Sequence, residues 1–344
     1  MLTGQSLAIG PTDIKTAAAP YPDNVFRART SGQLIPMFAM TYETPALALA
    51  ASVHEGRGTG TVSMAVSALD GAVYTSIKKG TATYANAIAV CSNLVDTVNA
   101  VHVVHGEADT RFAVTPATYQ GHLDEWQSDY DTDIKAATGQ VSDVAMILAQ
   151  TCSWPAYVAL SGVAHASIGL AQLDAHRDNA AITLACPAYQ LAGNADGIHL
   201  TGAGSHHLGE LMARAHLAVV DGAGWNPLMP LSAIRTGAVI VVEFDVPVAP
   251  LVFDTTTVSA QTDYGFTYHD DTDSASIDSV ALGGNGTSVE ITLTATPSGT
   301  NPHVGYGYTG TKYGNLRDSE TAVSTLDATP LANWCVHFYE PVTT

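Results

Sequence analysis

A serine near the start of the chain and an Asp-x-x-His sequence almost two hundred residues later could together cleave an ester. Ser6 follows Gly4 and Gln5 in a glycine-containing turn, and only two residues separate Asp196 from His199. A serine hydroxyl is a weak nucleophile at neutral pH, so it needs a base within hydrogen-bond reach and a third group that fixes the tautomer of the base. We therefore predict Ser6 as the nucleophile, His199 as the general acid and base, and Asp196 as the orienting carboxylate.

The order of these motifs along the chain is more informative than either motif alone. A lone Gly-x-Ser is common in turns, and an Asp before a helix is often only a helix cap. Between the two motifs, Val103 and Val104 end an apolar strand, and a polar loop follows them. This order favours the catalytic interpretation. The loop consists of His105, Gly106, Glu107, Ala108 and Asp109.

These motifs resemble those of the SGNH hydrolases, and most closely the branch of sialate O-acetylesterase-like and acetylxylan-esterase-like enzymes. In that branch the first block reads Gly-Gln-Ser, the third resembles Gln-Gly-Glu-Ser/Ala-Asp/Asn, and the last is Asp-x-x-His. The resemblance covers roughly residues 1–230. It implies an α/β, flavodoxin-like three-layer sandwich with a parallel sheet. It also implies removal of acetyl groups from a polysaccharide or glycan through an acyl-enzyme on Ser6, without a cofactor.

The resemblance further implies an oxyanion hole built from backbone N–H groups. One donor is Ser6, and the other is a glycine after a second strand, which we expect to be Gly58, with Gly60 as a competing choice. His105 stands where the branch usually has Gln, and we expect its ring to be a third donor. Ala108 stands where other SGNH enzymes carry an oxyanion-hole Asn. The residues expected to support the serine loop are Gln5, Gly106, Glu107 and Asp109.

Composition limits the classes of partner. Of 344 residues, 46% are hydrophobic and 13% charged, which is enough apolar material for a sizeable core. A formal net charge of −19 makes nucleic acid and anionic membrane surfaces poor partners. No apolar run reaches the length of a membrane span, and no leader pattern opens the chain, so we expect any signal peptide to be absent or already removed. Acidity with few lysines is typical of secreted, phage-borne or salt-tolerant proteins, which favours an extracellular or phage-associated location.

Strands and helices alternate through residues 1–230, which predicts βαβ units and a parallel sheet. Only three residues precede Gly4, so the first strand is very short or lacks native residues. Residues 11–50 contain many prolines and are expected to be mainly loop, with a helix beginning near residue 46 and a short strand at 52–54. Further helices are predicted over 84–100, 115–137, 157–176 and 201–220, and strands over 101–104, 144–150 and 182–185.

The pattern changes near residue 230. Residues 231–344 show no convincing helix, and we predict a second, all-β sandwich domain there, following a hydrolase domain over residues 1–230. Strands are expected over 238–244, 277–282, 288–294 and 334–339. Tyrosines in this region could stack on sugars or simply pack against neighbouring residues. They are Tyr264, Tyr268, Tyr306, Tyr308 and Tyr313.

Other assignments are weaker. A broad esterase for short-chain or aromatic esters, or a non-catalytic glycan-binding phage or surface protein on the same scaffold, remain alternatives.

His206 and His207 are adjacent and cannot share a helix face, so we expect no metal site. The acidic segment 270–273 could bind calcium or form a solvated turn, and Glu107 with Asp109 could be a glycosidase pair. The four cysteines form no C-x-x-C pair; free buried thiols are expected, and a disulfide stays open.

Overall fold

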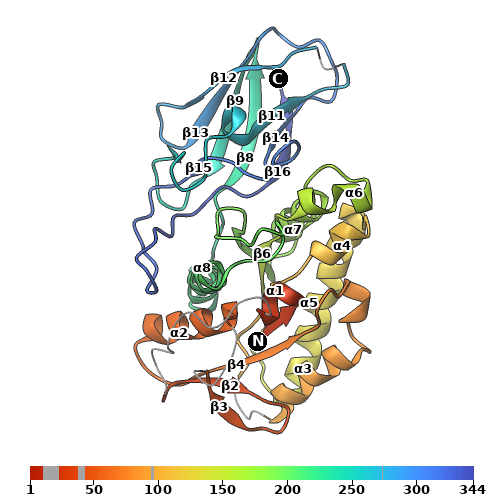
Figure 1. Ribbon diagram of the computed structural model, residues 1–344, viewed down its shortest axis with the longest axis vertical. Coiled ribbons are helices and arrows are strands. Elements are labelled where there is room, and N and C mark those ends of the chain that lie inside the picture. The colour runs from red at the N-terminus through yellow and green to blue at the C-terminus, as the bar shows by residue number, and fades with distance from the viewer. Residues whose placement is uncertain (11–22, 38–42, 94–96, 273) are drawn as a thin grey trace.

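A mostly parallel β-sheet between two layers of helices forms the first part of the chain (Figure 1). The structure is a computed structural model that describes residues 1–10, 23–37, 43–93, 97–272 and 274–344. Among these residues, seven strands form this sheet in the order β3-β2-β4-β1-β5-β6-β7, and only the β2/β3 pair is antiparallel. The strands are β1 Leu2–Gly4, β2 Val25–Ala28, β3 Leu34–Pro36, β4 Val62–Ala68, β5 Ala100–Val104, β6 Ala145–Gln150 and β7 Ile182–Pro187.

Both faces of this sheet are buried, because alternate side chains of a strand point to opposite faces. In β6, Met146 and Leu148 join one apolar cluster, whereas Ile147 and Ala149 join another. Helices α2 and α8 pack on the second cluster, and α3, α5 and α7 pack on the first. The helices are α1 Ser6–Ile9, α2 Pro45–Arg57, α3 Ala82–Asn93, α4 Glu107–Arg111, α5 Pro116–Thr138, α6 Val158–Ser161, α7 Ser167–Asp178 and α8 Gly202–Val220, with short 3₁₀ turns η2 Tyr74–Ser76, η3 Trp154–Tyr157 and η4 Thr262–Gly265.

The longest predicted helices are present for the reasons that the sequence suggested. The apolar stripe of α5, at Tyr119, Leu123, Trp126 and Tyr130, is buried along its whole length. Burial of each such side chain stabilises the fold by about 1.5–3 kcal/mol. The N-terminus of α8 is capped by Thr201, whose side chain accepts a hydrogen bond from the Gly204 N–H at 3.1 Å.

Several local predictions are wrong. Residues 52–54 are not a strand but belong to α2, and the strand β4 that follows them was not predicted. Residues 25–28 and 34–36, expected to be loop, form β2 and β3 at the edge of the sheet. The helix expected over 157–176 is broken into α6 and α7, because Gly162 ends α6 in a left-handed conformation. The predicted helix over 84–100 ends at Asn93 as α3; residues 94–96, and residues 11–22 and 38–42 of the expected loop, lie outside the described residues.

A second sheet is formed entirely by the C-terminal part of the chain. Among the described residues it has seven strands in the order β11-β14-β16-β8-β9-β13-β12, all antiparallel except the β8/β16 pair. The predicted fold class, an α/β layer structure followed by an all-β part, is therefore confirmed. The strands are β8 Met229–Thr236, β9 Val239–Asp245, β11 Phe266–His269, β12 Ile277–Leu282, β13 Ser288–Leu293, β14 His303–Tyr306 and β16 Phe338–Thr343, and β10 Val252–Phe253 pairs separately with β15 Leu316–Arg317.

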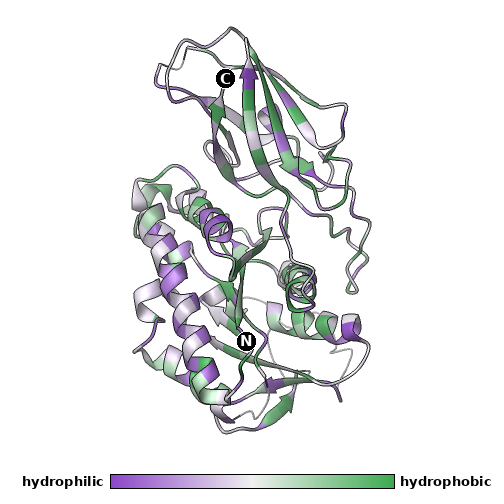
Figure 2. Cartoon of the chain, turned by 180° about the vertical axis from the view of Figure 1, so that it is seen from behind, coloured by the Kyte–Doolittle hydropathy of each residue, from purple (hydrophilic) through white to green (hydrophobic). Residues whose placement is uncertain are grey.

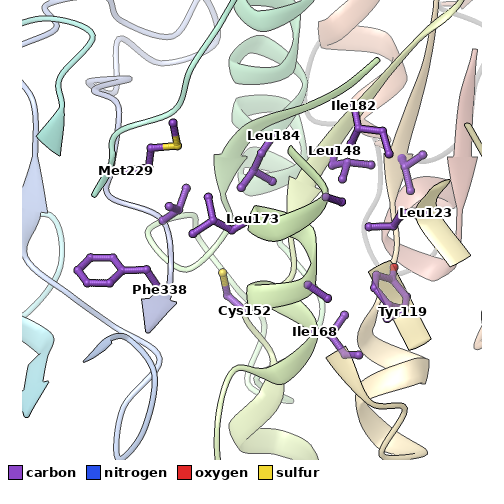
Figure 3. Close-up of a cluster of buried hydrophobic side chains, with 14 of the residues drawn as sticks. Tyr119, Leu123, Leu148, Cys152, Ile168, Leu173, Ile182, Leu184, Met229 and Phe338 are labelled. Carbon is purple, nitrogen blue, oxygen red and sulfur yellow. The ribbon is translucent and has the colours of Figure 1, made fainter. Parts of the chain in front are cut away.

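We call residues 229–344 the β part and the residues before them the α/β part. The two parts share one apolar cluster, which runs from Tyr119 and Leu123 on α5 through Leu173 on α7 to Met229 and Phe338 of the β part (Figure 3). Figure 2 shows the hydrophobic strands at the centre of the α/β part and the mixed surfaces of its helices. A shared core indicates that the β part packs on the α/β part and is not a loosely tethered module.

Buried hydrogen bonds cross the same boundary. The Gln150 side chain accepts a hydrogen bond from the His337 N–H at 2.7 Å and donates to the His337 carbonyl at 3.1 Å. The Tyr189 hydroxyl donates to the Cys335 carbonyl at 2.8 Å, and the Trp154 ring donates to the Gly307 carbonyl at 3.3 Å. These bonds fix the orientation of the β part on the carboxyl end of the parallel sheet.

Four of the five tyrosines considered for sugar stacking are buried or pack against another aromatic ring. Tyr306 and Tyr268 are buried, Tyr264 stacks on Phe253, and Tyr308 stacks on Tyr339. Tyr313 differs, because it is 38% exposed. All four cysteines are buried and free.

Candidate active site

Ser6 lies at the carboxyl end of the central strand β1, where the chain turns sharply into α1. Strand β1 pairs with β4 on one side and β5 on the other, which is the point where open α/β sheets place their ligands. Gly4 has φ 140°, and a Cβ atom there would lie 2.0 Å from the Val104 carbonyl oxygen. Only glycine fits this turn. The turn is fixed further by the Gln5 N–H, which donates to the Val104 carbonyl at 3.2 Å.

The structure brings His199 and Asp196 to this serine. The His199 Nε2 atom lies 2.8 Å from Ser6 Oγ, and its Nδ1 atom lies 2.7 Å from Asp196 Oδ2. If Nδ1 carries the proton that the carboxylate accepts, Nε2 is free to accept the proton of the Ser6 hydroxyl. A nucleophile, a base and an orienting carboxylate therefore lie in one hydrogen-bonded chain.

The turn that carries Asp196 and His199 follows β7 and is held by its own hydrogen bonds. Asp196 Oδ1 accepts the Ile198 N–H at 2.9 Å and the His199 N–H at 3.0 Å. Burial opposes ionisation of Asp196, but the hydrogen bond from the His199 ring and these two N–H bonds outweigh it, so the pKa of Asp196 lies below its ordinary value. The Asn194 N–H donates to the His199 carbonyl at 2.7 Å, which closes the turn.

The polar loop after β5 supports the serine turn. The Gln5 side chain accepts the Ala108 N–H at 3.2 Å, so the serine turn and this loop are directly joined. Glu107 Oε1 accepts the Thr151 hydroxyl at 2.7 Å, and Asp109 Oδ2 accepts the Tyr74 N–H at 3.1 Å.

Both carboxyl groups of this loop are buried, with consequences for their ionisation. Burial raises the pKa of Glu107, and it raises the pKa of Asp109 to about 6. Glu107 and Asp109 bond to different partners, Thr151 and the Tyr74 N–H, and each bond braces a different neighbouring segment.

At Gly106 the backbone of this loop passes close to the side chains of Ile168 and Thr151. Its φ is 137°, and a Cβ atom there would lie 2.8 Å from Ile168 Cγ2 and 2.9 Å from Thr151 Cγ2. A larger residue at this position would push the loop away from α7.

His105 does not take the expected role of oxyanion donor. Its ring is buried, and its Nε2 atom lies 2.9 Å from the Ala72 carbonyl, which can only accept. Burial lowers the pKa of His105 to about 4, so the ring is neutral and carries one N–H. That N–H is donated to Ala72, and the Nδ1 atom lies 2.8 Å from the Tyr119 hydroxyl. The ring therefore has no N–H left for an oxyanion, and His105 instead holds the loop after β4.

Gly58 is also wrongly placed for an oxyanion hole. It caps the C-terminus of α2, and its N–H already donates to the His54 and Glu55 carbonyls at 3.0 and 3.1 Å. Gly58 and its competitor Gly60 precede β4, whereas Ser6 follows β1, which is parallel to β4. The seven residues of β4 therefore separate these glycines from Ser6 by roughly 20 Å.

Gly71 is the glycine in the loop that follows β4. The Leu69 N–H donates to the Gly4 carbonyl at 3.1 Å, which joins the loop after β4 to the serine turn. After Gly71, the Ala72 carbonyl lies 2.9 Å from His105 Nε2, and the Tyr74 N–H donates to Asp109. Hydrogen bonds therefore hold the chain both before Gly71, at Leu69, and after it. The sequence signal for this glycine is the strand over 62–68, followed by Leu-Asp-Gly at residues 69–71.

A cavity of about 110 Å³ adjoins His199. Its wall includes Glu107 and Gly197 from the α/β part and also Lys312 and Tyr313 from the β part. Sequence alone does not point to Lys312, because its ammonium contacts the carbonyl of Gly197, 115 positions away. Apolar residues complete the wall; they include Leu7, Cys152, Ala188, Leu191 and Ile198.

Within the described residues, no group of three or more His, Cys, Asp or Glu side chains is arranged to hold a metal ion. No helix in the described part of the chain has both the length and the apolar character needed to cross a membrane.

Comparison with known families decides the assignment. The family described as "Carbohydrate esterase, sialic acid-specific acetylesterase" matches residues 33–218, which is 186 of the 344 residues. The chain belongs to this family. The resemblance seen in the sequence is thereby confirmed, and the protein is a carbohydrate esterase. The matched range contains Asp196 and His199 but not Ser6, so the assignment of Ser6 depends on the geometry described above.

Solved structures are similar in fold. A carbohydrate acetylesterase from Xanthomonas citri aligns with a TM-score of 0.68 at 14% identity, covering 98% of this chain and 79% of that one. A protein from Arabidopsis thaliana aligns with a TM-score of 0.51 at 16% identity, covering 63% of this chain and 96% of that one. The first likeness extends over both parts of this esterase. No curated protein sequence matches the chain.

Proposed function

We propose that this carbohydrate esterase removes acetyl or other short acyl groups from a glycan through an acyl-enzyme on Ser6. The observation that carries the proposal is the hydrogen-bonded chain from Ser6 Oγ to His199 Nε2, 2.8 Å, and from His199 Nδ1 to Asp196 Oδ2, 2.7 Å. This is the arrangement that activates a serine hydroxyl towards a carbonyl carbon.

In the proposed reaction, His199 takes the proton of Ser6 as Oγ attacks the ester carbonyl. The bond between the carbonyl carbon and the sugar oxygen then breaks, and His199 returns the proton to that oxygen. A water molecule then gives a proton to His199 and attacks the acyl carbon, the bond between that carbon and Ser6 Oγ breaks, and His199 returns the proton to Oγ as the acid leaves. Asp196 stabilises the imidazolium at both stages without taking its proton.

Backbone N–H groups would stabilise the oxyanion. Ser6 is the first residue of α1, and the first N–H groups of a helix have no acceptor within the helix. The second donor in this proposal is the Gly71 N–H, in place of Gly58 and His105. Loss of one such donor typically costs about 10²–10³ in kcat.

The size of the cavity favours a short acyl group. Its volume of about 110 Å³ is well below the roughly 300–1,000 Å³ of sites that enclose drug-sized ligands. The sugar would then lie outside this cavity, against residues of both parts. In the same proposal residues 1–230 are the hydrolase domain and residues 231–344 an accessory domain that also completes the pocket.

Acetate release from acetylated glycans and hydrolysis of p-nitrophenyl acetate test the proposal. Ser6→Ala should lower kcat roughly 10⁴-fold or more, since the variant lacks the nucleophile. Ser92→Ala, an exposed serine on α3, is the matched control and should keep the wild-type rate. Wild-type activity in Ser6→Ala would refute the proposed nucleophile, and an inactive wild-type protein that binds glycan would favour a non-catalytic scaffold.

A further inference from the structure

A second cavity lies where the two parts of the chain meet, next to the cavity beside His199. Its volume is about 460 Å³, within the roughly 300–1,000 Å³ of sites that hold small ligands, and we call it the interface cavity. One wall is formed by the loop after β7 and by α8, and includes Tyr189 and His207. The other wall belongs to the β part and includes Ser259 and Trp334. The proposed function assigns the cavity beside His199 to a short acyl group, so the sugar of the ester needs space next to it.

The two cavities share part of their walls. Tyr189, Leu191 and Tyr313 line both of them. Tyr189 is only 3% exposed, whereas Tyr313 is 38% exposed, so of these two rings it is Tyr313 that a ligand can reach. An exposed aromatic ring offers a flat apolar face to the C–H groups of a sugar. A chain of linked sugar units that begins beside His199 would therefore pass this ring and continue into the interface cavity.

The wall of the interface cavity favours an uncharged ligand. Its described residues include no lysine or arginine. They include one carboxyl group, on Asp327, and one imidazole, on His207, and these two groups pair with each other, with His207 Nε2 3.1 Å from Asp327 Oδ1. The exposed residues Thr257 and Ser259 add hydroxyl groups, which can donate and accept hydrogen bonds. A neutral sugar suits such a wall better than a fatty acyl chain, which would cover these polar groups without hydrogen-bonding to them.

Hydrogen bonds hold both walls in place. In the β part, the Asn315 side chain is fully buried and donates to the Val258 carbonyl at 2.9 Å and to the Ser259 carbonyl at 3.2 Å. On the other side, the Glu210 carboxylate of α8 accepts the N–H and the hydroxyl of Thr325 at 2.8 and 2.7 Å, which ties that segment of the β part to α8. The cavity is therefore formed before a ligand binds, and binding costs little conformational freedom of the protein.

We propose that the interface cavity is a second sugar-binding subsite, which holds a neutral sugar unit linked to the unit that carries the ester. The inference rests on the proposed function and narrows its substrate to an acylated oligosaccharide or polysaccharide. Because this subsite lies away from the reacting ester, its contacts strengthen binding of the substrate more than they speed the chemical step, and so lower KM more than they raise kcat. The β part, which supplies Tyr313 and Ser259, then distinguishes a sugar chain from a single sugar.

Acetate release from two matched pairs of substrates tests this inference. One pair is O-acetylated xylose and O-acetylated xylotriose, and the other is an O-acetylated sialic acid, free and as part of sialyllactose. In both pairs the added units are neutral sugars. Wild-type protein should favour the longer substrate of at least one pair by roughly tenfold to a hundredfold in kcat/KM, mainly through a lower KM, since a few hydrogen bonds and one ring contact have this worth.

Three variants locate the preference for the longer substrate. Ser259→Trp fills the interface cavity from an exposed position and should bring the ratio of longer to shorter substrate close to one. Tyr313→Ala removes the ring that both cavities share and should lower the same ratio several-fold. The matched control is Ser279→Trp, at an exposed position on the edge strand β12, and it should leave the ratio unchanged.

Several results would overturn the inference. Equal kcat/KM on the shorter and the longer substrate of each pair, or hydrolysis of p-nitrophenyl acetate with neither pair hydrolysed, would mean that no second sugar unit is bound. A length preference that Ser259→Trp and Tyr313→Ala both retain would mean that the added units bind elsewhere. A preference for p-nitrophenyl octanoate over the acetate that is lost in Ser259→Trp would assign the cavity to the acyl chain. Absence of any esterase activity would refute the proposed function itself, which is a distinct outcome.

Discussion

The contact between the two parts makes a quantitative prediction at Gln150. This side chain is fully buried at the end of β6 and makes three hydrogen bonds to main-chain groups. It donates to the Gly169 carbonyl at 2.9 Å and to the His337 carbonyl at 3.1 Å, and it accepts the His337 N–H at 2.7 Å. Gln150→Met keeps the length of the side chain and removes all three bonds.

Each main-chain group left unpaired in the interior costs about 1–3 kcal/mol. The Gly169 carbonyl keeps its hydrogen bond within α7, so two groups, the N–H and the carbonyl of His337, lose their partner. Gln150→Met should therefore lower the free energy of unfolding by about 2 kcal/mol or more, and with a denaturant slope of about 3 kcal/mol per molar in urea the unfolding midpoint should fall by roughly 0.7 M. Because one apolar cluster spans both parts, the wild-type protein should unfold in a single transition.

Urea unfolding followed by tryptophan fluorescence and by circular dichroism measures both quantities. Gln120→Met is the matched control, since Gln120 is only half-buried on α5 and its one side-chain hydrogen bond in the described structure is to Asp178, at 2.8 Å. It should change stability by less than about 0.5 kcal/mol. An unchanged midpoint in Gln150→Met, or two separate transitions in the wild-type protein, would refute the reasoning that the two parts share a core.

The remaining predictions concern the site and the β part. Asp196→Asn should lower kcat less than His199→Ala does. The double variant Ser6→Ala/His199→Ala should lose little more activity than either single variant, because the triad residues act as a unit. Esterase kinetics on these four variants test both expectations. Burial raises the pKa of Asp109 to about 6, above the ordinary value of about 3.9. The stability that Asp109 contributes to the fold is therefore fully present below about pH 4 and is lost as the pH rises through 6. Asp109→Asn should therefore flatten the pH dependence of the unfolding free energy between pH 4 and 6, and an unaltered profile would contradict the assignment. A chain ending at Gly224 should aggregate, because it exposes the apolar surface that includes Leu173; a soluble truncated chain that keeps full activity on small esters would argue against a packed interface.

The parts of the fold that local sequence determines were predicted well. The stripe of α5 and the cap of α8 at Thr201 follow from helical spacing and capping alone. Asp196 and His199 come together within one turn, so their contact needs no long-range information. The contact of His199 with Ser6, 193 positions away, could be expected only from the resemblance and from the rule that ligands lie at the carboxyl ends of parallel strands.

The errors have a common origin in strand assignment. Residues 52–54 have the composition of a strand, but the packing of α2 against α8 keeps them helical. The true strand is β4, and the glycine that follows it is Gly71. His105 could not be distinguished from a donor by sequence, because its role depends on the Ala72 carbonyl and the Tyr119 hydroxyl. The position of Lys312 could not be predicted for a similar reason, since only the docking of the β part brings this residue to the cavity beside His199.

The central claim, that Ser6 forms a covalent intermediate, is tested most directly by a serine-reactive phosphonate. Mass spectrometry of the digested protein after a short incubation should find the adduct on Ser6, at one equivalent, with parallel loss of esterase activity. His199→Ala should label far more slowly, because the hydroxyl then lacks its base. An adduct on a different residue, or complete inactivation with Ser6 unmodified, would contradict the account.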